Sequence, residues 1–195
     1  MSLPIKFFLY LFLFVLLSGL SAKAQTGMGT AGGINYPGFS SSATQNNQFK
    51  VGYGYSLFLR HAVTGLSEHV KLHARYSADF FYNKIDLPSE NNVKYNFTDF
   101  TTGMLIVFNR FTPYNFYGGI SLSYMSSRTE SRYFSFDSQE FIPKIFGGFE
   151  YQIAEYYNLF SEIFFQFGTI AAAEEPLPVN GVGLMIGATM FFSTE

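Results

Sequence analysis

Apolar and polar side chains alternate along most of this chain with a period of two. The stretch HVKLHARYSADF, residues 69–80, shows the pattern most clearly. Its apolar or aromatic series, continued to residue 82, is Val70, Leu72, Ala74, Tyr76, Ala78, Phe80 and Tyr82; its polar series is His69, Lys71, His73, Arg75, Ser77 and Asp79. Because side chains repeat every two residues in a β-strand, the stretch predicts a strand with one apolar face and one charged face.

Eight segments are expected to be strands on this pattern. They are residues 27–36, 48–60, 69–82, 93–108, 115–125, 140–152, 158–168 and 181–192. Most span ten residues or more, which suits a tilted membrane strand of about 9–11 residues. Within residues 93–108 the apolar series changes phase after Phe97, which predicts a β-bulge near residues 98–100.

The connections between these segments alternate in length. Residues 61–67, 109–115 and 154–158 form brief connections, whereas residues 37–47, 83–92, 126–139 and 171–180 are longer and more polar. Short turns at one end and long loops at the other are typical of a transmembrane barrel whose long loops lie outside the cell and whose termini lie in the periplasm. The sequence therefore predicts an all-β fold, an eight-stranded antiparallel up-and-down transmembrane β-barrel. A secreted lipocalin-like barrel or sandwich is the alternative.

The composition favours the membrane barrel. Aromatic residues make up 20% of the chain and charged residues only 13%, whereas soluble domains average about 25% charged residues. Too few charges are present to cover a surface that faces water on all sides. The absence of cysteine excludes disulfides and thiolate metal sites.

The first 24 residues predict a signal peptide. Lys6 precedes the apolar run FFLYLFLFVLL, and Ala22 and Ala24 form an A-x-A cleavage site. The run is shorter than the roughly 20 residues of a spanning helix; a retained anchor is the alternative. We expect a barrel domain of residues 25–195 in the bacterial outer membrane. Without Lys6 and Lys23 it carries 10 basic and 14 acidic residues, which argues against nucleic acid as a partner.

Aromatic residues are expected to form two girdles at the membrane interfaces. The residues expected near the long loops are Phe80, Tyr82, Tyr95, Phe97, Tyr124, Phe141 and Phe167; those expected near the short turns are Phe116, Tyr151, Tyr157 and Phe192.

The polar faces are expected to line the lumen, because an eight-stranded barrel is just wide enough for side chains to fill it. The predicted lumen network is Lys71, Arg75, Asp79, Lys144, Glu150 and Glu162, with Lys50, Arg60 and Gln166 also pointing inward. Glu150 and Glu162 could form an acid–base pair, but the neighbouring basic residues favour a mixed-charge plug. His69 and His73 lie about 13 Å apart on a strand, so no metal site is expected.

The stretches NFYGGISLSYM, PKIFGGFEYQI and GLMIGATMFF, with the rest of the chain after residue 24, resemble small outer-membrane barrels of the OmpA/OmpX type. More narrowly, they are similar to the PorT-like barrel domains of gliding and anaerobic bacteria. Some small barrels modify lipid A with a Ser–His pair near the outer leaflet. No histidine lies in the long connections here, so an enzyme of that kind is the less favoured alternative.

The expected function is that of a non-enzymatic outer-membrane barrel without a cofactor. It would be a structural or surface-interaction protein, or an accessory subunit of an envelope or secretion assembly; a narrow pore is the alternative. Outer-membrane lipid is an expected partner, and an envelope or secretion-assembly protein is a possible one. Aromatic and Arg side chains are frequent interface anchors. The candidate contact residues, all in the connection 126–139, are Arg128, Arg132, Tyr133, Phe134 and Phe136. The alternative for this connection is a pair of strands that simply extend beyond the membrane, as in OmpX-like proteins.

Overall fold

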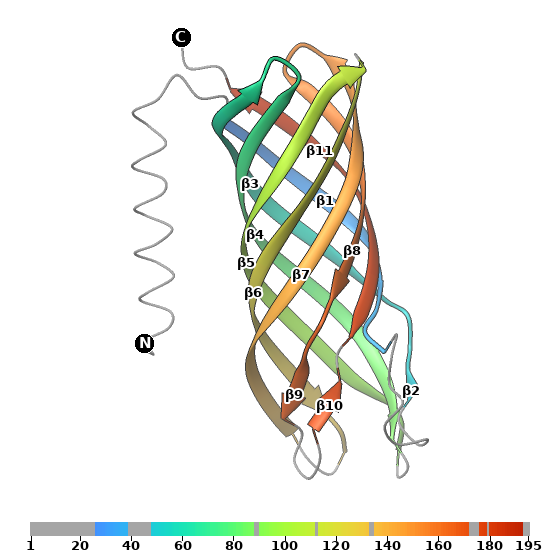
Figure 1. Ribbon diagram of the computed structural model, residues 1–195. Helices are drawn as coiled ribbons and strands as arrows, with labels where there is room; N and C mark the ends of the chain where they lie inside the picture. The colour runs from blue at the N-terminus through green and yellow to red at the C-terminus, as the bar shows by residue number, and fades with distance from the viewer. Residues whose placement is uncertain are drawn as a thin grey trace.

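In the part of the chain that the structure describes, eight long strands form the wall of a barrel (Figure 1). The computed structural model describes residues 26–38, 48–87, 90–111, 113–132, 135–171, 176–178 and 180–192. The wall strands are β1 (Thr26–Tyr36), β3 (Gly52–Ser67), β4 (Val70–Leu87), β5 (Glu90–Phe111), β6 (Tyr114–Glu130), β7 (Ser135–Ala154), β8 (Tyr157–Gln166) and β11 (Gly181–Phe192). The predicted signal peptide, residues 1–24, lies outside the described residues.

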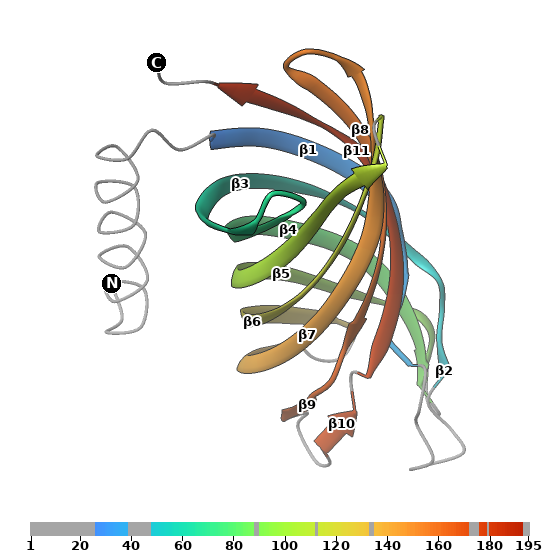
Figure 2. The same cartoon turned by 45° about the horizontal axis from the view of Figure 1, so that its top comes forward.

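These strands follow one another around the ring in chain order. The order is β4-β3-β1-β11-β8-β7-β6-β5, and a β4–β5 pairing closes the ring. Every neighbouring pair is antiparallel, and Figure 2 shows the wall encircling the interior. The predicted eight-stranded antiparallel barrel is therefore confirmed. We call the end where β1 begins and β11 finishes the turn end, and the opposite end the loop end (Figure 1).

The register of the pairs shows that the strands are strongly tilted. A path of paired residues once around the barrel runs through Phe141, Tyr124, Phe100, Ala78, Leu57, Thr30, Ala188, Leu159 and Tyr151. The path returns to β7 ten residues from its start, from residue 141 to residue 151. With eight strands spaced ~4.8 Å apart and a rise of ~3.3 Å per residue, this stagger gives a tilt of about 40°.

The β-bulge predicted in β5 is wrong. Residues 93–108 pair with β4, and residues 94–108 pair with β6, in both cases without a break in register. Val93, Tyr95 and Phe97 face inward, as do Leu105 and Val107 further along the same face. The change of phase in the sequence therefore marks the point beyond which the outer face also becomes apolar, while the backbone stays regular. Tyr95 and Phe97 consequently line the lumen and do not belong to the outer girdle.

An irregularity lies instead between the short strand β2 (Gln48–Phe49) and β3. Phe49 pairs with Ile85 and Tyr53 with Tyr82, so one extra residue is accommodated between the two pairs. Phe49 is buried in the interior, while the side chain of Lys50 is 41% exposed. The prediction that Lys50 points into the lumen is therefore wrong, because the extra residue changes the phase of the alternation.

Four wall strands extend further at the loop end than the others. The predicted connections 83–92 and 126–139 are mostly strand, since β4 continues to Leu87, β5 begins at Glu90, β6 continues to Glu130 and β7 begins at Ser135. We call residues 83–87, 90–96, 127–130 and 135–139 of these strands the protruding sheet. The shorter β8 ends at Gln166, opposite Lys144. Two further short strands, β9 (Thr169–Ala171) and β10 (Pro176–Pro178), form a small hairpin at the same end.

The outer face of the wall is apolar between its two ends. The exposed fraction is 54% for Leu57, 68% for Ile120 and 63% for Ile186. A continuous exposed band of this kind is what membrane barrels direct toward lipid. Girdle positions such as Tyr82 and Phe141 are also exposed on this face. No helix among the described residues is long and apolar enough to cross a bilayer.

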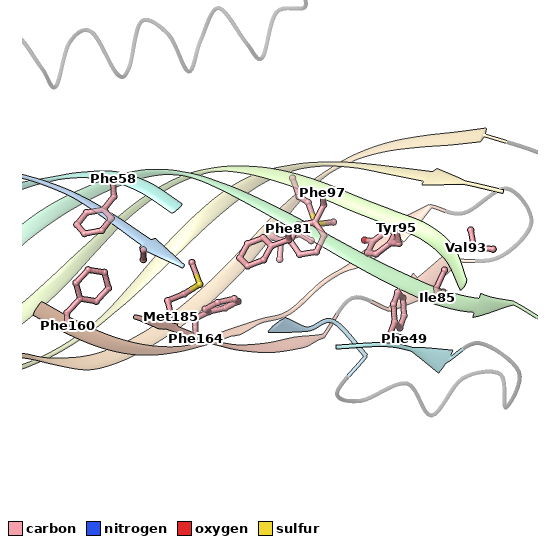
Figure 3. Packing of buried hydrophobic residues seen from close by; sticks show 13 residues of the cluster. Phe49, Phe58, Phe81, Ile85, Val93, Tyr95, Phe97, Phe160, Phe164 and Met185 are labelled. Atoms are coloured by element: carbon pink, nitrogen blue, oxygen red, sulfur yellow. The ribbon is translucent and has the colours of Figure 1, made fainter. Parts of the chain in front are cut away.

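The interior is filled by aromatic rings that lie against glycines of other strands (Figure 3). A Cβ on Gly29 would lie 2.2 Å from a ring carbon of Phe58, and one on Gly183 would lie 2.3 Å from the ring of Phe164. Glycine at these positions therefore makes room for the ring of the residue paired with it on the adjacent strand. This packing explains why the inward faces of β1, β3 and β11 are rich in glycine.

Candidate functional site

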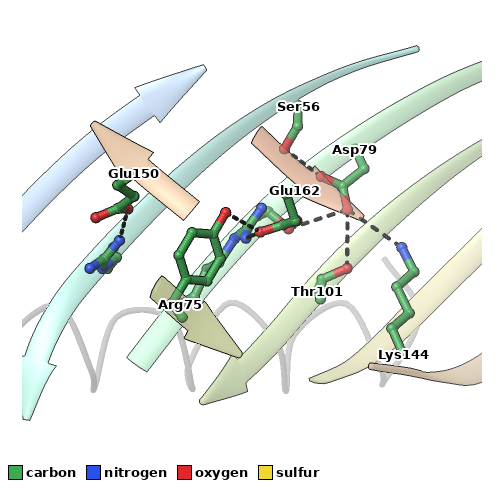
Figure 4. Close-up of polar contacts among 10 residues, drawn as sticks. Ser56, Arg75, Asp79, Thr101, Lys144, Glu150 and Glu162 are labelled. Atoms are coloured by element: carbon green, nitrogen blue, oxygen red, sulfur yellow. Dashed lines mark hydrogen bonds and ion pairs between the residues drawn. The ribbon is translucent and has the colours of Figure 1, made fainter. Parts of the chain in front are cut away.

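The lumen holds three buried cationic side chains, Arg60, Arg75 and Lys144, each of which contacts a carboxylate from another strand (Figure 4). Each cation also lies near two aromatic rings. The cation–ring pairs are Arg60 with Tyr117 and Phe191, Arg75 with Phe58 and Phe146, and Lys144 with Phe81 and Phe164, at 4.7 to 5.9 Å from the ring centroids. Rings and carboxylates together replace the water that the cations lose on burial.

Lys144 joins β7 to β4 and β5. Its Nζ lies 2.6 Å from Oδ2 of Asp99 and 3.5 Å from Oδ2 of Asp79. The Ser56 hydroxyl donates to Oδ1 of Asp79 at 2.5 Å, and the Thr101 hydroxyl donates to its Oδ2 at 3.4 Å. One ammonium group thus bridges two carboxylates, and hydroxyls on β3 and β5 further stabilise that of Asp79.

Arg75 joins β4 to β8 across the lumen. It forms an ion pair with Glu162, whose Oε2 also accepts a hydrogen bond from the Tyr117 hydroxyl at 3.0 Å. The Glu162 carboxylate is almost fully buried. It therefore depends on these two donors for the hydrogen bonds that water would otherwise supply.

Arg60 joins β3 to β7 nearer the turn end. It pairs with Glu150, which also accepts a hydrogen bond from the Asn158 amide at 3.3 Å. The Nε of Arg60 donates to Nδ1 of His73 at 3.3 Å. This contact requires Nδ1 to be unprotonated, so the ring serves as an acceptor for a neighbouring cation.

Of the six residues predicted to form the network, Arg75, Asp79, Lys144, Glu150 and Glu162 contact one another or a further lumen residue. Lys71 lies near the turn end, is half-exposed, and forms no ion pair with a described residue.

Two members of the network were missing from the predicted set. Arg60 was expected to point inward, but its pairing with Glu150 joins residues 90 positions apart in sequence. Asp99 was not expected in the lumen because the bulge proposed at residues 98–100 would have disturbed the alternation there. An unbroken period of two from Val93 through Asp99 to Leu105 is the signal that identifies it.

The interior leaves little free volume. The cavity between Arg75, Lys144 and Glu162 measures about 30 Å³, enough for one or two water molecules. Toward the loop end, side chains including Phe49, Phe97 and Ile142 pack into an apolar cluster (Figure 3). The lumen is therefore plugged by charged side chains and by apolar ones.

The polar groups of the lumen do not form an evident catalytic or metal centre. Glu150 and Glu162 each contact a different arginine, so neither has the free, proton-accepting environment of a general base. His61 hydrogen-bonds to Thr26 at 3.1 Å, and His69 lies in an exposed turn. Among the described residues, no group of three or more His, Asp or Glu side chains is placed to hold a metal ion.

The candidate contact residues lie at the β6–β7 hairpin. Tyr133 and Phe134 fall outside the described residues, and only the backbone of Phe136 is described, within β7. Arg128 lies on the outer face, with Nε 2.9 Å from Oε1 of Glu130 and 3.9 Å from Oδ1 of Asp137. Arg132 follows the end of β6 and is exposed. The expected contact region is thus largely a two-stranded extension of the wall.

A second polar cluster lies on the outer face at the loop end. The Nζ of Lys50 is 3.0 Å from Oδ2 of Asp86 and donates to Oδ1 of Asn92 at 2.8 Å. The backbone N–H of Asn92 donates to Oδ1 of Asp86 at 2.7 Å. Asn92 has a φ of 60°, a left-handed conformation that asparagine tolerates better than most residues. The cluster therefore fixes the start of β5 against β2 and β4.

This cluster should respond to acid. The hydrogen bond from the Asn92 backbone, together with Lys50, lowers the pKa of Asp86. A carboxylate whose pKa is lowered on folding stabilises the folded state above its unfolded pKa of about 3.9, and this contribution is lost as the pH falls through the folded value. In an NMR titration of the folded barrel, the Asn92 amide should therefore shift with a midpoint below pH ~3.9. Asp86→Asn should abolish the shift, and a midpoint at or above pH ~3.9 would contradict the assignment.

Comparisons with known proteins identify the fold. No protein-family model matches the chain, and neither does any curated protein sequence. Among solved structures, OprG from Pseudomonas aeruginosa superposes with a TM-score of 0.59 at 11% identity, covering 88% of this chain and 97% of that one. Neisserial surface protein A gives 0.57 at 12% identity, covering 88% and 98%. Ail, the attachment invasion locus protein of Yersinia pestis, gives 0.52 at 12% identity, covering 87% and 97%.

These similarities cover almost the full length of each neighbour. At 11–12% sequence identity, they establish a shared fold only. They agree with the ring of eight antiparallel strands and with the apolar outer band. The chain is an eight-stranded β-barrel of the small outer-membrane type, with the fold of OmpA- and OmpX-like proteins.

Proposed function

We propose that this chain is a non-enzymatic integral outer-membrane protein that acts through protein contacts made by its protruding sheet. The observation that carries the proposal is the combination of a plugged lumen with strands that continue beyond the rest of the wall at one end only. A filled interior leaves the surface as the part of the molecule available for function. In the orientation that we propose, the loop end lies outside the cell, and both termini lie in the periplasm after removal of residues 1–24.

The edge of β7 is the part of the protruding sheet best suited to contact. Among the described residues, β8 pairs with β7 only from Lys144 onward, and the Phe167 backbone N–H donates to the carbonyl oxygen of Pro143 at 3.0 Å. Residues 135–142 therefore have a paired strand only on the β6 side. A strand edge of this kind offers backbone N–H and C=O groups to an extended segment of another protein. Of the candidate contact residues, Arg128 is paired with Asp137, which belongs to this edge.

The other functions are less well supported. A narrow pore needs a continuous polar path, whereas the polar network here borders a cavity of only about 30 Å³ and an apolar cluster. A lipid-modifying enzyme needs an activated nucleophile near the loop end, whereas His61, His69 and His73 all lie toward the turn end. An accessory role in an envelope or secretion assembly uses the same edge and differs only in the identity of the partner.

Site-specific crosslinking in intact cells tests the proposal. A photo-crosslinking amino acid would replace Ser135, at the exposed start of β7, and in a matched control it would replace Ile145, which faces outward on the same strand within the apolar band. We expect discrete protein adducts from position 135 and none of the same mass from position 145. A stoichiometric adduct with an envelope protein in pure culture indicates an accessory subunit. An adduct that forms only when an external surface is supplied indicates a surface-interaction protein. Identical patterns from the two positions would overturn the proposal.

A further inference from the structure

A row of charged residues crosses the outer face of the barrel at the loop end. The backbone N–H of Lys50 donates to the carbonyl oxygen of Lys84 at 2.8 Å. Lys84 is paired directly with Lys94 on β5, and Lys94 is paired with Glu130 on β6. Three lysines are therefore neighbours in one row: Lys50 directly after β2, Lys84 on β4 and Lys94 on β5.

The outer members of this row already have partners of opposite charge. Lys50 is held by Asp86 at 3.0 Å, and Glu130 is held by Arg128 at 2.9 Å. Lys84 and Lys94 are exposed and form no ion pair with a described residue. The middle of the row thus carries two positive charges that form no ion pair with a described carboxylate, although Glu130 is the β6 residue paired with Lys94.

The two lysines lie directly opposite each other on adjacent strands. Side chains at such positions have Cβ atoms about 5 Å apart, and like charges placed there are destabilising. The ammonium groups stand at the ends of flexible four-carbon chains and can converge on one acceptor. An anion with several oxygens, such as a phosphate group, would remove the repulsion and accept hydrogen bonds from both lysines.

The surroundings indicate where that anion comes from. On the membrane side of Lys84, Tyr53 and Tyr82 stack with their ring centroids 5.4 Å apart, and Tyr55 and Phe80 stack at 4.8 Å. Exposed aromatic groups of this kind mark the membrane–water interface. Lys84 lies two residues beyond Tyr82 on the same tilted strand. This places Lys84 about 5 Å further toward the loop end, measured along the barrel axis. This is the depth of lipid headgroups, directly above the acyl chains.

We propose that Lys84 and Lys94 bind a phosphate group in the headgroup of an outer-leaflet lipid, whose acyl chains lie along the aromatic surface below. The proposal rests on the orientation given under the proposed function, in which the loop end faces outward. It assigns a bound lipid to one side of the barrel, the outer face of β4 and β5. This side is separate from the β7 edge proposed for protein contacts.

Lipid binding by the purified full-length barrel tests the assignment. The probes are lipid A carrying both phosphates and the same lipid after dephosphorylation. Each is titrated into the barrel in detergent micelles, and native mass spectrometry counts the lipid molecules bound per barrel. The test variant is K84Q/K94Q. The control is K71Q, which removes a lysine charge near the turn end, away from the row.

We expect K84Q/K94Q to bind phosphorylated lipid A about 10- to 30-fold more weakly than the unmodified barrel, since each lysine near a membrane surface contributes on the order of a fewfold to tenfold. The control should stay within about twofold of the unmodified barrel, and K84R/K94R should retain binding.

Dephosphorylated lipid A should bind the unmodified barrel as weakly as phosphorylated lipid A binds K84Q/K94Q. Inorganic phosphate at equal concentration should not displace the lipid; if it does, the site is one for free phosphate. Equal binding by K84Q/K94Q and the control would overturn the proposal.

The two proposals can fail separately. Because the sequence has no cysteine, Ser135→Cys gives a single thiol whose labelling by a membrane-impermeant maleimide on intact cells reports the orientation. Labelling without any specific crosslink at position 135 would refute the protein-contact function and leave the lipid site standing. Unchanged lipid binding by K84Q/K94Q would refute the lipid site and leave a crosslink from position 135 standing, since neither lysine lies on β7.

Discussion

Glu162→Gln is expected to lower the free energy of unfolding by about 3–5 kcal/mol, the cost of leaving a buried charge without its partner. The substitution keeps the shape of the side chain but leaves the Arg75 guanidinium in the lumen without a carboxylate. It also removes the charged acceptor of the Tyr117 hydroxyl. The sequence contains no tryptophan, so unfolding in urea is best followed by circular dichroism and by the shift in gel mobility between folded and unfolded barrel.

Glu155→Gln is the matched control, because Glu155 lies in the exposed β7–β8 turn. It should change the free energy of unfolding by less than ~0.5 kcal/mol. The double variant Arg75→Met with Glu162→Gln removes both charges and should recover part of the loss. If Glu162→Gln unfolds at the same urea concentration as the unmodified barrel, the Arg75–Glu162 pair does not hold β4 to β8.

Phe81→Ala is expected to destabilise the barrel by about 3–5 kcal/mol, as for other buried aromatic residues. Phe81 is 2% exposed and stacks on Phe97 with ring centroids 4.7 Å apart. Its ring also lies beside Phe164 and near Nζ of Lys144. The truncation would leave a cavity where the polar network meets the apolar cluster, and the same urea titration measures the effect.

The neighbouring residue provides the control for this variant. Phe80 is adjacent on β4 but faces outward, where it stacks against Tyr55. Lipid can fill the space left by Phe80→Ala, so this loss should be well below that of Phe81→Ala. Equal losses for the two variants would show that the interior is not packed around Phe81.

The alternation along the chain was sufficient to predict the strands and the closed ring, because each wall strand has one face toward lipid and one toward the lumen. The rule that apolar residues face lipid failed in β5, where Tyr95 and Phe97 fill the lumen near the loop end. An aromatic side chain suits either environment, so hydrophobicity alone does not tell them apart. The same ambiguity led to the bulge predicted at residues 98–100, and Asp99 was consequently absent from the expected network.

The partners within the network could not be predicted from the sequence. The inward direction of Arg60 and Glu150 follows from the alternation, but their contact joins non-adjacent strands 90 residues apart. Which charges meet across the lumen depends on the ten-residue stagger of the ring, and no short stretch of sequence specifies that stagger. The extension of β6 and β7 agrees with the alternative given for residues 126–139, whereas the extension of β4 and β5 was not predicted. Strands that leave the membrane have polar residues on their outer face and resemble loops.

The cross-lumen ion pairs connect early and late parts of the chain. Arg60, Arg75, Asp79 and Asp99 belong to β3, β4 and β5, whereas their partners Lys144, Glu150 and Glu162 belong to β7 and β8. A partly assembled barrel that lacks β7 and β8 therefore holds two unmatched arginines and two unmatched aspartates. These side chains then lack the partners that they have in the closed ring, which disfavours their burial in a bilayer. The interior ion pairs are complete only once β7 and β8 have joined the wall, so we expect membrane insertion and ring closure to be coupled.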